Sequence, residues 1–148
     1  MFAWLKDWLD EKPASPRTAK QATGDGGERL AAEFLQREHG FKIIARNWRS
    51  PRDRRDEIDL ICRDGEALVF VEVKTRAGHA LVQGYEAVTK QKKDILRRAA
   101  TDYLRALAPA NRPHTFRFDI VEVATRTSGA PDVRHFANVP LFPKYFQA

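Results

Sequence analysis

The chain has 148 residues, of which 43% are apolar, and this length allows one globular domain with a buried core. No stretch approaches the ~18 uncharged apolar residues of a membrane span, and charges within the first eight residues argue against a signal peptide. The single Cys62 excludes an internal disulfide, and the four histidines have no zinc-ligand spacing with it, so we expect a cytoplasmic protein. The net charge of +6 favours a polyanionic partner such as nucleic acid.

The amino-terminal segment, residues 1–11, has its large apolar side chains at helical spacing, which predicts a short amphipathic segment. Such a segment would dock on a protein partner or a membrane surface, pack on the domain itself or remain loosely ordered, and the sequence leaves these alternatives open. Residues 12–26 contain Pro, Ser, Thr, Ala and Gly without apolar periodicity, which predicts a flexible linker. The folded domain is therefore expected over residues 27–148.

A helix is predicted over residues 27–39, with Gly40 as its carboxyl-terminal stop. Glu28 lies in the first turn, and its spacing from Ala31 and Leu35 directs it towards the core-facing side. This direction makes Glu28 a candidate functional residue. The alternative is an acid favoured only by the helix dipole.

Two strands are predicted over residues 42–48 and 57–62. The loop between them, residues 50–56, contains three arginines and no apolar residue. We therefore expect this loop on the surface.

Glu72 and Lys74 stand inside the next strand, predicted over residues 67–74, which is otherwise apolar. Side chains alternate along a strand, so these two point to one face, about 6.6 Å apart. Charges are seldom placed in such a strand without a function. The structural alternative is a neutralised cluster that fixes the strand register.

The dipeptide Asp64-Gly65 predicts a two-residue hairpin turn before this strand. That turn would place Asp59 opposite Phe70, on the same face as Glu72 and diagonal to it. Two carboxylates and one ammonium group would then converge. Hard oxygen ligands of this kind suit Mg²⁺ or Mn²⁺, and a neighbouring lysine suits an anionic group such as phosphate.

The clearest helix is predicted over residues 86–107, followed by a strand over 115–124 and a tail, 131–148, with a final short strand and an arm. The polar face of the helix is basic and could contact phosphate, although most such faces are merely solvated. The order of elements predicts an α/β domain with a mixed sheet of four or five strands flanked by helices. The residues of the basic face are Lys90, Lys92, Lys93, Arg97 and Arg98.

Asp59 followed by Glu72-Val73-Lys74 resembles the core motif of the PD-(D/E)-x-K nuclease superfamily. The wider pattern resembles the YraN family of uncharacterised bacterial proteins, which is regarded as similar to archaeal Holliday junction resolvases. The segments that carry the resemblance are Gly27-Glu28, Gly40-Phe41, Glu57-Ile58-Asp59-Leu60-Ile61, Phe70-Val71-Glu72-Val73-Lys74-Thr75-Arg76 and Arg117-Phe118-Asp119.

The resemblance implies a restriction-endonuclease-like fold and a site that hydrolyses phosphodiesters. Asp59 and Glu72 would hold Mg²⁺ or Mn²⁺, Glu28 would complete the acidic cluster, and Lys74 would orient water or offset developing charge. No small-molecule cofactor is implied. Three further bases would bind phosphates without reading sequence, namely Arg76, Lys90 and Lys93.

The sequence thus predicts a metal-dependent, structure-selective endonuclease that acts on branched DNA in repair or recombination. The alternative is a non-catalytic nucleic-acid-binding accessory module on the same fold. A third hypothesis places the function in the amphipathic segment, as an adaptor. Resolvase-like relatives often form dimers, which makes a homodimer an open expectation. One departure is Asp56, where the family usually has glycine, and this acid could join the site as an outer carboxylate.

Overall fold

A computed structural model describes residues 19–77 and 88–142 of the chain. Within these residues the chain forms two α-helices, one short 3-10 helix and five β-strands. In chain order they are α2 (Ala19–His39), β1 (Lys42–Arg49), β2 (Glu57–Asp64), β3 (Ala67–Ala77), α3 (Lys90–Ala106), η1 (Pro109–Asn111), β4 (Thr115–Thr125) and β5 (Asp132–Phe136).

The five strands form one sheet in the order β1-β2-β3-β4-β5. β3 and β4, which flank α3 in the chain, pair in parallel, whereas the other three neighbouring pairs are antiparallel. The predicted mixed sheet is therefore confirmed. Its arrangement is consistent with a restriction-endonuclease-like α/β fold, and β3 is the central strand.

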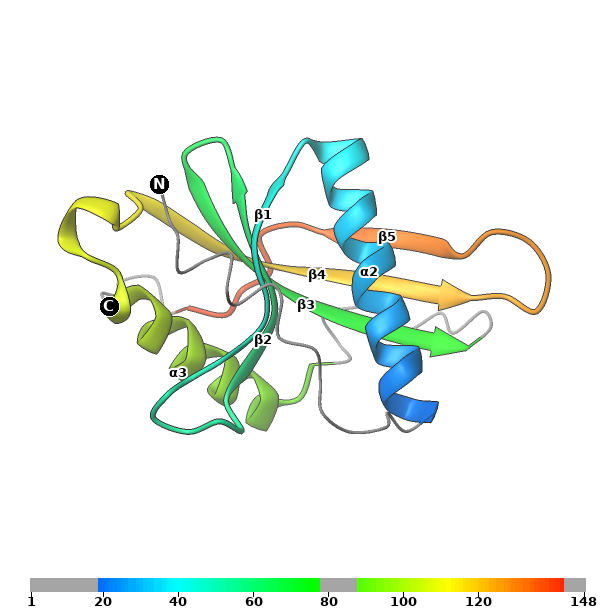
Figure 1. Ribbon diagram of the computed structural model, residues 1–148, viewed down its shortest axis with the longest axis horizontal. Helices are drawn as coiled ribbons and strands as arrows, with labels where there is room; N and C mark the ends of the chain where they lie inside the picture. Colours follow the sequence, from blue (N-terminus) through cyan, green and yellow to red (C-terminus); the bar gives the residue numbers. More distant parts are fainter. Residues whose placement is uncertain (1–18, 78–87, 143–148) are drawn as a thin grey trace.

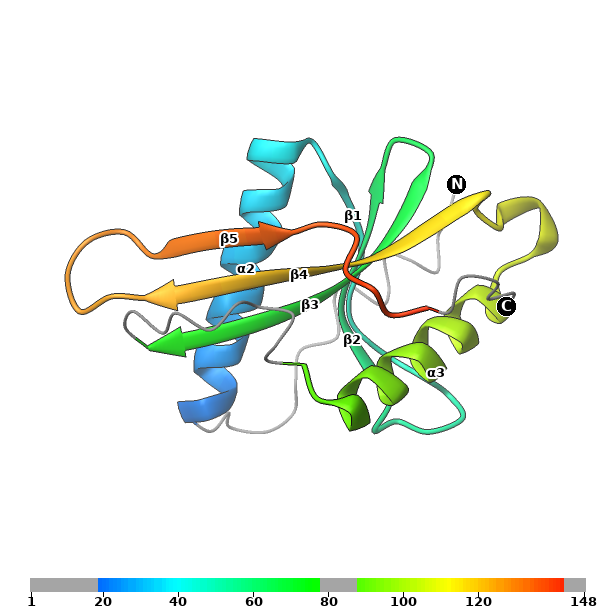
Figure 2. The same ribbon diagram turned by 180° about the vertical axis from the view of Figure 1, so that it is seen from behind.

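The two helices cover opposite faces of the sheet, as the two opposite views show (Figure 1, Figure 2). α2 buries Ala31, Ala32 and Leu35 against Val69 and Val71 of β3 and neighbouring residues. α3 buries an aliphatic stripe against the other face, formed by Leu96, Ala99, Ala100 and Leu104 with Phe70, Phe118 and Ile120. Because helices cover β3 on both faces, its side chains are apolar on both faces of the sheet, except at its charged positions.

Helix α2 ends where the sequence predicts but begins earlier. The backbone at Gly40 has a φ of +67°, a left-handed conformation that glycine adopts without strain, and α2 ends there as predicted. The helix begins at Ala19, however, eight residues before the predicted start. The prediction of a flexible linker was therefore wrong for residues 19–26. Two glycines and short polar side chains there had argued against a helix.

Other predicted segments lie outside the described residues: the amphipathic segment 1–11, the linker residues 12–18 and the end of the tail. The final short strand expected in the tail is confirmed as β5. No helix among the described residues is long and apolar enough to cross a membrane.

Candidate active site

Glu72 and Lys74 lie on the central strand and share a face, as side-chain alternation predicts. The Glu72 side chain is only 4% exposed, and its carboxylate is buried on the face of the sheet that α3 covers. Its Oε1 atom lies 3.3 Å from Nζ of Lys74 and 3.6 Å from Nζ of Lys92. Two ammonium groups therefore contact a single oxygen of this buried acid.

Asp59 joins this cluster through a register different from the predicted one. Asp64 pairs with Ala67, so the hairpin turn is Gly65-Glu66, and Ile61, rather than Asp59, lies opposite Phe70. The shift amounts to two residues, and an even shift leaves every side chain on its face. Continuing the observed pairs by one step places Asp59 directly opposite Glu72, in place of the predicted diagonal.

The Asp59 carboxylate is held in place by the neighbouring strand. Its Oδ2 atom accepts a hydrogen bond from the Val73 N–H at 2.8 Å. Burial raises the pKa of Asp59 well above its usual value of 3.8, and the charges of Glu72 and Glu28 raise it further, against the Val73 hydrogen bond and Lys92. Between the usual and the raised pKa the folded chain binds more protons than the unfolded chain, so this group lowers stability as pH rises. A cation bound beside Asp59 would relieve that cost.

The second carboxylate oxygen of Glu72 has a different environment from the first. Oε2 of Glu72 is buried and has no hydrogen-bond partner in the part of the chain that the structure describes. Buried carboxylate oxygens normally have partners, so this oxygen could coordinate a cation or accept a hydrogen bond from water. The donor set fits Mg²⁺ or Mn²⁺, which take carboxylate oxygens together with water and substrate phosphate oxygens.

Few protein ligands are in place for such an ion. Over residues 19–77 and 88–142, no three acids, histidines or cysteines are grouped so that they could hold a metal. An ion would therefore be held by Asp59 and Glu72, with water and phosphate completing its shell. This is the usual mode for Mg²⁺ at phosphoryl-transfer sites.

Glu28 is brought towards the cluster by a close approach between α2 and β3. A Cβ atom built on Gly27 would lie 1.9 Å from Oγ1 of Thr75, the residue after Lys74. Only a glycine allows the helix backbone so near this strand. Glu28 follows Gly27 directly, and its charge contributes to the raised pKa of Asp59. The structure thus brings Glu28, Asp59, Glu72 and Lys74 into one neighbourhood.

Alanine substitutions at the two adjacent glycines of α2, Gly26 and Gly27, should change the stability of the fold in opposite directions. Gly27→Ala should destabilise the fold by about 1–3 kcal/mol, because the added methyl group collides with Thr75. Gly26→Ala should stabilise it by about 0.5–1 kcal/mol, because a Cβ there meets nothing within 4 Å and alanine favours the helix. Urea denaturation of both variants measures the difference. Equal effects at the two glycines would contradict the close approach.

The sequence reasoning missed Lys92, which the structure places at Glu72. Lys92 lies four residues before Leu96 and seven before Ala99, so the helical period puts it on the core-facing side of α3. That spacing was the available signal. Lys90 is exposed and Lys93 partly exposed, and their contact with phosphate stays a prediction.

Glu122 on β4 is a second acid that the sequence reasoning missed. Glu122 pairs in register with Lys74 and is only 4% exposed, and its Oε1 lies 3.9 Å from Nε of Arg76. Its Oε2 is also buried without a hydrogen-bond partner among the described residues. An acid between Val121 and Val123 in a buried strand was the signal. Arg76, predicted to bind phosphate, is thus held beside Lys74 by a buried carboxylate.

Asp56 does not join the acidic cluster. It is buried and accepts hydrogen bonds at 3.0 and 3.1 Å from the guanidinium group of Arg98 on α3. The expectation of an outer carboxylate at the site was wrong, because this acid fixes the β1–β2 loop to a helix. The loop is also not wholly on the surface, since Ser50 is fully buried.

The Arg117-Phe118-Asp119 segment forms a separate polar network. Asp119 is fully buried, and it accepts hydrogen bonds from Arg117 at 3.0 Å and from the Asn138 N–H at 2.9 Å. Its Oδ2 also lies 2.8 Å from Nε2 of His135, and Arg117 donates a further bond to Asp64 at 2.9 Å. The network therefore ties β4 to β5 and to the β2–β3 hairpin.

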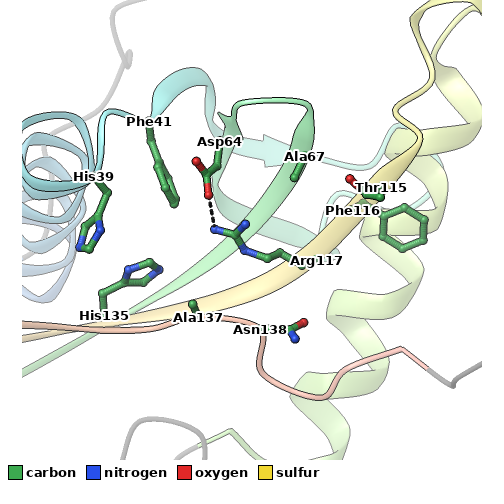
Figure 3. A pocket seen from close by; sticks show the side chains of 10 residues that line it. All are labelled: His39, Phe41, Asp64, Ala67, Thr115, Phe116, Arg117, His135, Ala137 and Asn138. Atoms are coloured by element: carbon green, nitrogen blue, oxygen red, sulfur yellow. Dashed lines mark hydrogen bonds and ion pairs between the residues drawn. The ribbon is translucent and has the colours of Figure 1, made fainter.

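This network borders a pocket of about 580 Å³ near the end of α2. Figure 3 shows Phe41, His39 and His135 beside the Asp64–Arg117 ion pair around this space. The guanidinium carbon of Arg117 lies 5.5 Å from the centre of the Phe41 ring. Because its charged groups already pair with one another, we interpret the pocket lining as structural.

Comparison with known proteins places the chain in a family. The model of the uncharacterised protein family UPF0102 matches residues 27–123. A UPF0102 protein of Beutenbergia cavernae is 44% identical over 121 residues, which cover 82% of this chain and 98% of that protein. A UPF0102 protein of Symbiobacterium thermophilum is 49% identical over 106 residues, which cover 72% of this chain and 85% of that protein. The chain therefore belongs to the uncharacterised protein family UPF0102, which is the YraN family.

Proposed function

We propose that this protein is a metal-dependent endonuclease that hydrolyses phosphodiester bonds in structured DNA. The observation that carries the proposal is the buried Oε2 of Glu72, which has no hydrogen-bond partner within residues 19–77 and 88–142 and lies on the strand next to Asp59. Two buried acids on paired strands, one with an oxygen free to coordinate, are a suitable site for one divalent cation. The resemblance to the PD-(D/E)-x-K superfamily supports the same chemistry.

Each residue of the cluster has a separate role in this proposal. A bound Mg²⁺ or Mn²⁺ would polarise a phosphodiester oxygen and lower the pKa of a bound water. Asp59 and Glu72 would hold the ion, and the Val73 N–H keeps the Asp59 carboxylate oriented towards it. Lys74, 3.3 Å from Glu72, would orient the attacking water or offset negative charge on phosphorus.

The substrate class follows from charge and from the resemblance to Holliday junction resolvases. The chain has a net charge of +6 and no motif that reads base edges. Contacts with phosphates would therefore position the DNA, and selection would depend on its shape. Branched or otherwise structured DNA is the class that this combination favours.

One observation favours the non-catalytic alternative, in which the domain only binds nucleic acid. Lys74 and Lys92 both lie within 3.6 Å of Oε1 of Glu72 and compensate its charge without a metal. A purely structural cluster of this kind would bind no divalent ion.

Cleavage assays distinguish the two functions. The full-length chain is incubated with branched, nicked and single-stranded DNA in Mg²⁺ or Mn²⁺, beside Lys74→Ala and the exposed control Lys42→Ala. We expect cleavage of branched DNA that Lys74→Ala lowers at least about a hundredfold and Lys42→Ala leaves unchanged. Cleavage that persists unchanged in Lys74→Ala would contradict the proposed role of the cluster.

A further inference from the structure

We propose that the β1–β2 loop, residues 50–56, is a preformed contact surface for the backbone of duplex DNA. The inference rests on the proposed function and adds a second point of contact beside the acidic cluster. The loop presents three exposed arginines, Arg52, Arg54 and Arg55. Arginine suits this role because its planar guanidinium group can donate two parallel hydrogen bonds to one phosphate.

The loop is held in one conformation at both of its ends. The Ser50 N–H donates to the Asp56 carbonyl at 2.9 Å, which closes the loop, and the Asp56 N–H donates to the Asp53 carbonyl at 2.9 Å. Ser50 Oγ donates to Asp102 of α3 at 2.6 Å, and Arg98 of α3 binds Asp56 through two hydrogen bonds. A loop fixed in this way loses little conformational entropy on binding.

The arginines of the loop extend from this fixed backbone into solvent. The side chains of Arg52 and Arg55 are 73% and 89% exposed. Arg55 pairs with Asp53, whose pKa is lowered to about 2 by the side-chain hydrogen bond from Arg55, so that acid is ionised at neutral pH. Arg98 of α3 neutralises Asp56. Arg52 also lies 3.7 Å from Asp102. Three arginines against the two acids Asp53 and Asp102 therefore leave a net charge of +1 on the outer surface of the loop.

Helix α3 sets the distance between this surface and the acidic cluster. Lys92 of α3 contacts Glu72, whereas Arg98, six residues further along the helix, contacts Asp56. Six residues rise about 9 Å along a helix, which is the length of about three base pairs of DNA. Figures 1 and 2 show the β1–β2 loop and the starts of α2 and α3 along the same lower side of the molecule. A duplex that reaches Glu72 would therefore also meet the loop.

Salt-dependent binding tests the inference with a charge-matched control. Anisotropy of a labelled DNA duplex is measured with the full-length chain, without divalent ions, from about 50 to 200 mM salt. The test variant is Arg54→Ala with Arg55→Ala, and the control is Arg37→Ala with Arg112→Ala, two exposed arginines on other elements. Each phosphate contact contributes about 0.9 to the slope of log affinity against log salt. We expect the loop variant to lower that slope by about 2 and the control to leave it unchanged.

A third variant tests whether the loop is preformed. Ser50→Ala removes the hydrogen bond to Asp102 without changing charge, so we expect weaker DNA binding with the slope retained. Equal slopes for the loop variant and the control, wild-type affinity of Ser50→Ala, or stronger competition by duplex RNA than by duplex DNA would each overturn the inference. Mn²⁺ binding and DNA cleavage are measured separately from DNA binding. If the wild-type chain cleaves DNA but the loop variant and the control bind DNA alike, the loop surface alone is overturned and the proposed nuclease function stands.

Discussion

The Glu72→Gln variant is expected to lose at least about a hundredfold in Mn²⁺ affinity and about a thousandfold in cleavage of branched DNA. The amide keeps the shape of the side chain but replaces one acceptor oxygen with a donor nitrogen, which cannot bind a cation. The buried Oε2 that has no partner among the described residues would thereby be lost as a ligand. Isothermal titration calorimetry with Mn²⁺ gives the affinity.

Glu66→Gln is the matched control for this variant. Glu66 is exposed in the β2–β3 turn, and the same substitution there changes the net charge equally. The control should bind Mn²⁺ and cleave DNA as the wild type does. Thermal denaturation of both variants shows whether the fold is retained. An unchanged Mn²⁺ affinity in folded Glu72→Gln would remove Glu72 from the metal site.

The Asp119→Asn variant should show the largest loss of stability, about 3 kcal/mol at neutral pH. The carboxylate is fully buried and holds Arg117, His135 and the Asn138 N–H together, so its loss leaves several donors without an acceptor. Asp64→Asn removes the other, more exposed partner of Arg117 and should cost less than about 1 kcal/mol. Urea denaturation of the two variants gives both values.

The pH dependence gives this prediction a second measurement. Burial would raise the pKa of Asp119, but hydrogen bonds from His135, Arg117 and the Asn138 N–H outweigh it and hold the pKa below 3.8. The stabilisation is therefore present above the unfolded-state pKa and is lost as pH falls through the folded-state pKa. The difference between wild type and Asp119→Asn should shrink on acidification below about pH 4. A constant difference from pH 7 to pH 3 would contradict an ionised Asp119.

Much of the fold could be predicted because the pattern of apolar residues indicates which faces of the strands and helices are buried. Strand β3 has apolar residues on both faces, which is typical of a central strand, and β3 lies in the middle of the sheet. Asp59 was placed on the correct face despite a wrong register, because the hairpin shifted by two residues and the side-chain period is two. The choice between two adjacent turn positions is not encoded in the alternation itself.

The remaining features depend on contacts between segments distant in sequence. The start of α2 was missed because two glycines and short polar residues are poor helix formers, so local propensity argued against a helix there. Lys92 and Glu122 each had a signal in the sequence, but their partners, Glu72 and Arg76, become evident only from the packing of separate elements. Asp56 could not be assigned because its partner, Arg98, lies on a helix 42 residues later.

The position of a bound ion tests the central claim most directly. Crystals of the full-length chain are soaked in Mn²⁺, and diffraction data are collected at a wavelength where manganese scatters anomalously. We predict an anomalous peak within coordination distance, about 2.2 Å, of a carboxylate oxygen of both Asp59 and Glu72, and no such peak in Glu72→Gln. A fully soaked crystal without manganese between Asp59 and Glu72, or with the same peak in Glu72→Gln, would contradict the metal site.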